Sequence, residues 1–359
     1  MIVGMMHRVL LGLCFLLPIA LSAQVKYSNE FLNLGVGAKA LAMANTQTAT
    51  SQDVTSAYWN PAGLSLLENS QEAFLMHAEY FAGIAAYDYA GWAYRVDENQ
   101  ALAVNVLRFA VDDIPNTTML IDNQGNINYN RISYFTTADW AVLLSYGRNL
   151  SDWAEGLSLG GSAKIIRRRI GDFAGAWGFG LDLGLQYRKG AHWNFGFVAH
   201  DVTSTFNAWT SSLTEEEVAV FKATGNALPE DGLEYTRPHF SFGAAYGFRW
   251  KEHFTTHLAL DADLFCDGRR HNLLSGNTFS FDPHFGLETG YRDVVFLRAG
   301  IGNIQHETDF DATEYTRCQV NIGIGLCIRK HLFIDYALTD LGNMSLSVYS
   351  HVFSLKFVF

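Results

Sequence analysis

A regular two-residue period runs through Trp177-Gly178-Phe179-Gly180-Leu181-Asp182-Leu183-Gly184-Leu185-Gln186-Tyr187. Apolar or aromatic side chains occupy the odd positions, and glycine or polar residues lie between them. Successive side chains of a β-strand point to opposite faces, so this pattern predicts a strand with one apolar face and one small or polar face. Residues 258–264 and 320–328 alternate in the same way. A soluble β-sandwich shows this alternation too, so the architecture depends on the rest of the chain.

Fourteen segments of the chain are predicted to be strands. They cover residues 71–80, 84–95, 99–110, 137–148, 156–168, 175–188, 191–200, 237–249, 253–264, 281–291, 293–302, 315–328, 331–339 and 347–359. Many of them contain about ten residues or more, which is the length of a tilted membrane strand. Strands of soluble domains usually have about 5–6 residues. An even number of long strands is typical of bacterial outer-membrane barrels.

The connections between these strands fall into two classes. Those after even-numbered strands are short, at 96–98, 150–155, 189–190, 250–252, 293 and 330. Those after most odd-numbered strands are longer, at 111–136, 201–236, 265–280, 303–314 and 340–346. Outer-membrane barrels have short periplasmic turns and long extracellular loops, whereas a sandwich has no reason to separate loop lengths by side. We therefore predict an all-β protein, a 14-stranded antiparallel transmembrane β-barrel over residues 71–359.

The composition agrees with one large β structure. The chain has 359 residues, 32 of them glycine, with 14% aromatic and only 17% charged residues. Lys and Arg number 25 and Asp and Glu number 36, which gives a formal net charge of −11. A chain this rich in apolar residues is not disordered, and its acidic charge argues against nucleic-acid binding. Cys318 and Cys327 fall on one predicted strand, about 30 Å apart, too far for a disulfide.

The N-terminus resembles a secretory signal peptide over residues 1–23. Arg8 supplies the positive charge, residues 9–19 are apolar, and Leu21-Ser22-Ala23 forms a small-residue cleavage site. The apolar stretch is shorter than the ~20 residues of a spanning helix, which disfavours the alternative of a membrane anchor. We expect cleavage near Ala23 and a final location in the bacterial outer membrane.

Residues 31–70 do not alternate, and we expect residues 24–70 to form a plug inside the barrel. Residues 37–44 and 51–59 are candidate short helices, the second with Ser51 as a plausible N-cap. Asn60, Pro61, Ala62 and Gly63 then form a turn motif. The segment is apolar and contains few charges, which favours a plug over the alternative of an N-terminal linker.

This segment also carries a resemblance to a known family. The residues from Phe31 to Met43, and those from Ser56 to Leu64 with the triplet Asn60-Pro61-Ala62, resemble the start of the PorV/PorQ family, which is related to FadL-like outer-membrane proteins. The resemblance implies a role in type IX protein secretion through protein contacts at the extracellular face. Its implied partners are the type IX translocon, the sortase PorU and cargo C-terminal domains. FadL-like relatives instead take up hydrophobic small molecules, and this is the alternative function.

The C-terminal strand carries a candidate assembly motif. Phe353, Leu355, Phe357 and Phe359 alternate onto one face, and the last residue is aromatic. The pattern resembles the terminal β-signal that the barrel-assembly machinery recognises. The alternative is an ordinary final strand that ends in phenylalanine.

The sequence predicts no catalytic, cofactor or metal site, and no enzyme. Aromatic residues in the long loops, Phe206, Trp209 and Phe221 in 201–236 and Tyr129 in 111–136, are candidates for an extracellular protein contact. A loop cap packed on itself explains them equally well. The basic run Arg167-Arg168-Arg169 points either to lipopolysaccharide or an acidic partner, or to salt bridges at the barrel rim and in its lumen. Outer-membrane lipid and lipopolysaccharide are therefore expected partners.

Overall fold

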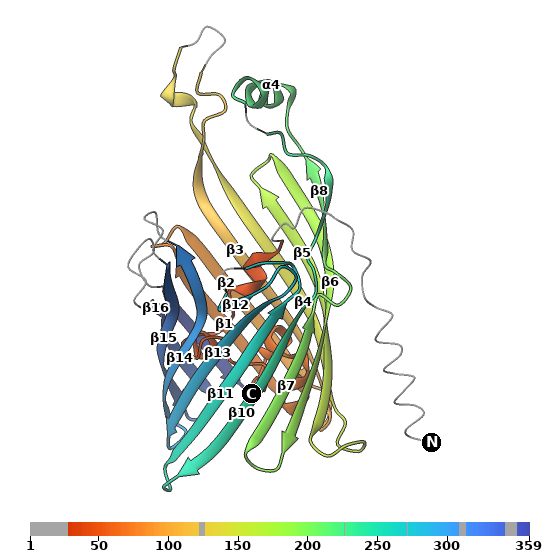
Figure 1. Cartoon of the computed structure of the whole chain (residues 1–359), viewed down its shortest axis with the longest axis vertical. Coiled ribbons are helices and arrows are strands. Elements are labelled where there is room, and N and C mark those ends of the chain that lie inside the picture. Colours follow the sequence, from red (N-terminus) through yellow and green to blue (C-terminus); the bar gives the residue numbers. More distant parts are fainter. Residues whose placement is uncertain (1–27, 122–125, 226, 271, 309–313, 342–349) are drawn as a thin grey trace.

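A computed structural model describes residues 28–121, 126–225, 227–270, 272–308, 314–341 and 350–359. The predicted signal peptide lies outside these residues. The wall of the molecule is one closed antiparallel sheet of fourteen strands (Figure 1). These are β1 (Gln71–Tyr80), β2 (Ala85–Arg95), β3 (Gln100–Asn116), β4 (Ser133–Asn149), β5 (Leu157–Ile170), β6 (Ala174–Lys189), β7 (Trp193–His200), β10 (His239–Trp250), β11 (Phe254–Phe265), β13 (Ser280–Tyr291), β14 (Val295–Thr308), β15 (Glu314–Ile328), β16 (Leu332–Leu341) and β17 (Ser350–Val358).

The barrel closes where its last strand meets its first. β17 pairs with β1 from Glu72↔Val358 to Glu79↔His351, and it pairs with β16 on its other side. Each wall strand is therefore hydrogen-bonded to two neighbours, which satisfies the backbone without a free sheet edge. The predicted fourteen-stranded barrel is confirmed.

The alternation in the sequence separates the lipid-side face from the lumen. On β6 the odd positions point outward, and Trp177 and Leu183 are 54% and 55% exposed. Inward-pointing residues such as Asp182 and Gln186 are buried. The outer face also carries exposed aromatic residues near the short turns, as expected for an interfacial girdle. They include Trp92, Tyr94, Trp193, Trp250 and Tyr291.

The two ends of the barrel differ as predicted. We call the end with the tight connections, such as residues 190–192 and 292–294, the short-turn end. At the opposite, long-loop end, the β3–β4 hairpin rises furthest above the wall, and α4 (Glu215–Ala223) lies beside it (Figure 1). Thr214 caps α4 through a capping box with Glu217, and acidic residues fill the first turn of the helix.

The strand pairing of the wall changes at the long-loop end of β7. β7 pairs with β10 up to the register pair His200↔His239, and the chain then turns away through Asp201 and Ser204, which both have positive φ. The part of β6 nearest the long-loop end pairs instead with β8 (Phe206–Ser211), and β8 pairs on its other side with β9 (Gly232–Tyr235). The predicted loop 201–236 thus contains two short strands and a helix. The two-residue strand β12 (Leu274–Ser275) pairs with β13.

The described part of the segment 24–70, residues 28–70, lies against the inner side of the barrel wall. It contains η1 (Glu30–Asn33), α2 (Ala38–Ala42), α3 (Ser56–Trp59) and η2 (Pro61–Leu66). Their apolar side chains are buried with lumen-facing residues of the wall in one core. The expected cap Ser51 is wrong, because α3 begins only after Thr55. Within the described residues, no helix is long and apolar enough to cross a bilayer.

Candidate functional site: the plug and the lumen wall beneath it

The plug lies on a set of lumen-facing glycines that we call the glycine seat. Its members share one property: an added Cβ would come within 3 Å of a plug atom. They are Gly147, Gly160, Gly184, Gly196, Gly243, Gly286, Gly300 and Gly323, on β4, β5, β6, β7, β10, β13, β14 and β15. At most of them the crowded atom belongs to the plug backbone. The glycines therefore let plug and wall approach more closely than any side chain would allow.

The turn motif of the plug sits on the closest part of this seat. Gly147, Gly160 and Gly184 stand in register on three adjacent strands. A Cβ at Gly160 would lie 2.2 Å from the carbonyl carbon of Pro61, and one at Gly184 would lie 2.1 Å from Asn60 Oδ1. The predicted motif residues are thus brought onto the wall, where Ala62 and Gly63 are also buried.

Asn60 fixes the motif by three hydrogen bonds. Its Nδ2 donates to Thr48 O at 2.7 Å, within the plug, and to Leu185 O at 3.1 Å, in the wall. Its Oδ1 accepts from the backbone N–H of Ala62 at 3.2 Å and so caps η2. A fully buried Asn keeps its place only when its polar atoms are paired in this way.

Ion pairs join the plug to the wall at three points. Glu30 accepts from Arg270, in the loop after β11, at 3.0 Å. Lys39 lies 3.7 Å from Glu288 on β13. Asp53 lies 2.9 Å from Lys356 on β17. These three are the only charged residues of the plug between positions 28 and 67, and each finds an opposite charge on the surrounding barrel.

The Asp53 pair is the shortest of the three, and both of its side chains are largely buried. Burial alone would favour the neutral acid, but the ammonium of Lys356 and hydrogen bonds outweigh it. The pKa of Asp53 is therefore held well below its usual range, and the group stays ionised near neutral pH. The attachment consequently depends on a charge that only strong acid removes.

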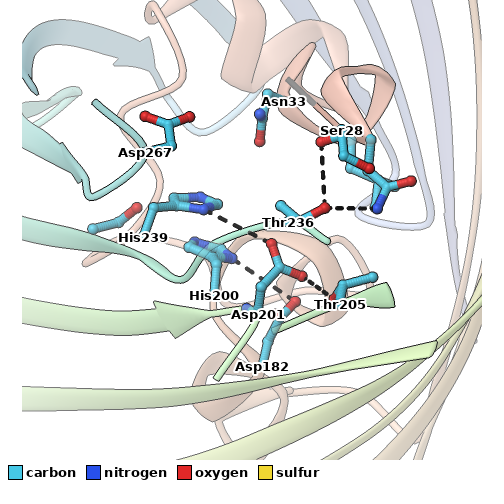
Figure 2. A network of polar contacts seen from close by, with 12 residues as sticks. Ser28, Asn33, Asp182, His200, Asp201, Thr205, Thr236, His239 and Asp267 are labelled. Atoms are coloured by element: carbon cyan, nitrogen blue, oxygen red, sulfur yellow. Dashed lines mark hydrogen bonds and ion pairs between the residues drawn. The ribbon is translucent and has the colours of Figure 1, made fainter. Parts of the chain in front are cut away.

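On the long-loop side of the plug lies a small polar cavity, which we call the chamber. Its volume is about 100 Å³, enough for roughly three water molecules. Figure 2 shows part of its wall, where His200 and His239 face Asp182 and Asp201. The two imidazole rings stack with centroids 4.4 Å apart. Their Nδ1 atoms lie 3.8 Å and 3.9 Å from the carboxylates of Asp182 and Asp201, respectively.

Lys164 is the cation at the base of this network. Its Nζ lies 2.8 Å from Asp182 Oδ1 and also contacts Asp201 Oδ1. Asp201 also accepts from Thr205 (Figure 2). All three charged side chains are buried, and such charges persist in an interior only when each is paired.

The N-terminal end of the plug closes the chamber from above. Ser28 accepts a hydrogen bond from Thr236 (Figure 2). Asn29 donates to Thr236, and Asn207 of β8 donates to both Ser28 and Asn29. Across the chamber, Thr48 of the plug donates its backbone N–H to Asp261 Oδ2 at 2.8 Å. The chamber also has apolar lining residues. These are Leu32, Tyr58, Trp59, Leu143 and Phe265.

A larger cavity, the vestibule, opens on the short-turn side of the plug. Its volume is about 480 Å³, within the range of small-molecule sites. Its charged lining includes Lys39, Asp53, Glu72, Glu288 and Lys356. Its apolar lining includes Met43, Leu66, Phe296, Phe333 and Val358. One plug segment, residues 43–53, therefore separates two cavities and contributes lining residues to both.

The aromatic residues chosen as extracellular contacts do not form one group. Tyr129 is 72% exposed on the β3–β4 hairpin. Phe206 lies against Phe179 on the outer face, and Phe221 of α4 packs on Phe173. Trp209 donates its indole N–H to Glu234 at 2.9 Å. The structure thus leaves only Tyr129 fully open to a partner.

The terminal motif and the basic run are divided between faces by the strand period. Phe353, Leu355 and Phe359 point outward with Phe357 on the same side of β17. Arg168 points inward to Asp139 at 3.0 Å and to Glu234 at 3.4 Å. Arg167 points outward over Trp177, and Arg169 pairs with Asp172 at the rim. The expectation of lumen and rim salt bridges is confirmed for the second and third arginines.

Sequence reasoning missed the chamber and the plug ion pairs. Their residues come from strands and loops far apart in the chain, so only the register of the closed barrel brings them together. The described residues contain no group of three or more His, Cys, Asp or Glu side chains arranged to hold a metal ion.

Comparison with known proteins identifies the fold. In sequence, the chain matches no family model and no curated protein. In structure it is similar to the monoaromatic hydrocarbon channel CymD, with a TM-score of 0.56 and 14% identity over 91% of this chain and 98% of that one. It is also similar to the toluene transporters TbuX of Ralstonia pickettii (TM-score 0.52, 15% identity, 90% and 98% coverage) and TodX of Pseudomonas putida (0.54, 14%, 90% and 98%). The chain therefore has the same fold as these hydrocarbon channels, a closed antiparallel β-barrel of fourteen strands.

Proposed function

We propose that this protein is an outer-membrane channel that takes up small hydrophobic molecules. One observation carries the proposal: plug segment 43–53 separates a chamber on the long-loop side from a vestibule of ligand size on the short-turn side. Both cavities carry apolar side chains on which a hydrophobic molecule can rest. The structural similarity of the barrel to hydrocarbon channels supports the same proposal. In the outer membrane the long-loop end then faces outward and the short-turn end faces the periplasm.

Passage requires this plug segment to move. It is attached to the wall by hydrogen bonds and ion pairs rather than by a covalent link. Such contacts can be exchanged for water within a lumen, whereas the strand ladders of the wall cannot open without breaking the barrel. The plug is therefore the gate of the proposed channel.

Uptake by a reconstituted protein tests the proposal. Radiolabelled toluene is offered to proteoliposomes that contain the purified barrel and a hydrophobic trap inside, with protein-free vesicles to measure direct diffusion. We expect faster accumulation with the protein, and a smaller excess for a hydrophilic solute of the same size. Equal accumulation with and without the protein would refute a channel for hydrophobic molecules.

A second candidate is a contact role in type IX secretion, as the resemblance of residues 31–64 implies. The tall β3–β4 hairpin favours it, because Ile121, Ile127, Tyr129 and Tyr134 are each more than half exposed there. Large exposed apolar groups on one projection are typical of protein contact sites. Under this proposal the hairpin binds the translocon, PorU or a cargo C-terminal domain at the cell surface.

Affinity purification from native outer membranes tests this second function. The tagged protein is compared with a variant in which Tyr129 and Tyr134 are both changed to Ser. Recovery of translocon, PorU or cargo with the parent and its loss with the variant would support the contact role. Recovery of none of them with the parent would exclude it.

A further inference from the structure

A row of alternating arginine and tryptophan residues crosses the outer face of the barrel. Arg108 (β3), Trp140 (β4), Arg167 (β5) and Trp177 (β6) are register partners on four adjacent strands. We call these four residues the interface row. Each guanidinium lies over an indole: Arg108 Cζ is 5.7 Å from the ring centre of Trp140, and Arg167 Cζ is 5.2 Å from that of Trp177.

The row marks the level at which the outer face changes from apolar to charged. On β5 the outward residues below it are Leu157, Leu159, Gly161, Ala163 and Ile165, and those from the row upward are Arg167 and Arg169. On β6, Trp177 stands ten residues from Tyr187 at the short-turn girdle, about 33 Å along a tilted strand and about 25 Å along the barrel axis. This span matches the apolar band of an outer-membrane barrel. The row therefore lies at the outer interface.

The Arg167 side chain points toward the headgroup layer. Its Nη1 donates to Ala176 O at 3.1 Å, and a Cβ added at Gly175 would lie 2.7 Å from this nitrogen. Gly175 is two residues nearer the long-loop end than Trp177, so the guanidinium lies over the indole with its Nη1 directed toward the long-loop end. Among the described residues no carboxylate forms an ion pair with Arg167, which leaves its charge to an external anion.

Arg108 provides a second, weaker cation on the other side of Trp140. Asp88 and Asp112 lie 3.5 Å and 3.6 Å from its guanidinium, so it is partly neutralised. The two arginines are separated by one strand, which places their backbones about 10 Å apart. Guanidinium groups bind phosphate by paired hydrogen bonds, and tryptophan prefers the membrane interface.

We propose that the interface row binds the phosphorylated sugar headgroup of lipopolysaccharide, with Arg167 as the principal phosphate contact and Arg108 as the secondary one. The commitment to lipid A rests on the position of the row. It lies in the outer leaflet half of the band, where a lipid with two phosphates on one rigid headgroup meets two guanidiniums with an indole between them. The binding is independent of the channel function.

Native mass spectrometry of the folded barrel in detergent tests this inference. Lipid A with both phosphates, dephosphorylated lipid A and phosphatidylglycerol are titrated separately onto the parent, Arg167→Gln, Arg108→Gln and Arg167→Lys. Arg249→Gln is the matched control, because Arg249 is an exposed arginine of β10 at the short-turn end, 3.7 Å from Asp293. Heat-modifiable migration on gels verifies that each variant is folded.

We expect the parent to retain phosphorylated lipid A at least about tenfold better than the dephosphorylated form, because hydrogen bonds to charged groups are the stronger class. Arg167→Gln should retain phosphorylated lipid A about tenfold less well than the parent, and Arg108→Gln should show a smaller loss. Arg249→Gln should retain it as well as the parent does. Retention by Arg167→Lys should fall between the parent and Arg167→Gln, because lysine lacks the planar fork of arginine. Equal retention of both lipid A forms, or equal losses in Arg249→Gln and Arg167→Gln, would overturn the site. Equal, Arg167-dependent retention of phosphatidylglycerol would overturn the assignment to lipid A.

Discussion

Replacement of Gly160 by alanine is the sharpest perturbation of the plug. The new Cβ would lie 2.2 Å from Pro61 C and 2.4 Å from Ala62 N. Ordinary contact is about 3.4 Å, so the Asn60–Ala62 turn must retreat by roughly 1 Å. That shift stretches the hydrogen bond from Asn60 Nδ2 to Leu185 O, now 3.1 Å, beyond bonding distance. Overpacking costs about 1–3 kcal/mol and the lost bond about 1 kcal/mol, which together disfavour the seated plug by about 2–4 kcal/mol.

Gly161→Ala is the matched control on the next residue of the same strand. Its Cβ would point outward and lie 3.4 Å from Leu183 Cδ2, which is ordinary contact. Both variants change strand propensity equally, so any difference between them reports the plug. Amide hydrogen exchange of residues 28–67 in the reconstituted barrel measures the effect.

We expect faster exchange across the plug in Gly160→Ala, by about 30-fold or more, with the wall strands unchanged. Proteoliposomes with this variant should also admit more toluene. Gly161→Ala should match the parent in both assays. Identical plug exchange in the two variants would refute the account in which the glycine seat holds the plug.

Three further predictions concern the polar contacts of the plug. Asp53→Asn leaves Lys356 without its ion-pair partner. We expect the attachment of the plug to weaken by about 1–3 kcal/mol, because the pair is mostly but not fully buried. Thermal unfolding and amide hydrogen exchange of the plug measure this change, and exchange equal to that of the parent would contradict it. Because its pKa is depressed by Lys356, Asp53 contributes stability that is complete above the ordinary Asp pKa of about 3.9 and is lost as the pH falls further. Limited proteolysis should therefore find the plug equally protected at pH 8 and pH 5 and less protected near pH 3, and this acid step should shrink in Asp53→Asn. Asn60→Ala removes two side-chain hydrogen bonds and a cap, with an expected cost of about 2–3 kcal/mol. Asn33→Ala should cost almost nothing, because the Asn33 side chain is exposed and donates to the exposed Glu30.

Much of the barrel could be predicted from the sequence because its physics is local. A strand between lipid and lumen must alternate between apolar and small or polar side chains, and the residues from Trp177 to Tyr187 show this alternation. Loop lengths then assign each connection to an end, since a hairpin returns the chain to the same side. The terminal motif on β17 follows from the same period.

The site could not be predicted because it depends on register. His200 and His239 stack only because β7 pairs with β10 after a 38-residue excursion through β8, α4 and β9. Gly160 is distinguishable from Gly161 only once the lumen side of β5 is known. The split of Arg167 from Arg168 follows from alternation, but the indole beneath Arg167 comes from the neighbouring strand. Ser51 is not the cap of α3, because this helix begins at Ser56, more than one turn after the start of the predicted helix 51–59.

A disulfide between the plug and the wall shows whether the plug is the gate of the channel. A Cβ at Gly302 would lie 3.3 Å from Ala44 Cβ, close to the roughly 3.5–4.5 Å that a disulfide joins, once the His284 ring turns aside. In the double variant Ala44→Cys, Gly302→Cys, toluene accumulation in proteoliposomes is measured on one preparation before and after reduction, with each single variant as a control. A gate formed by the plug predicts accumulation at the level of protein-free vesicles when the disulfide is closed and recovery when it is reduced. Equal accumulation in the closed and reduced forms would contradict it.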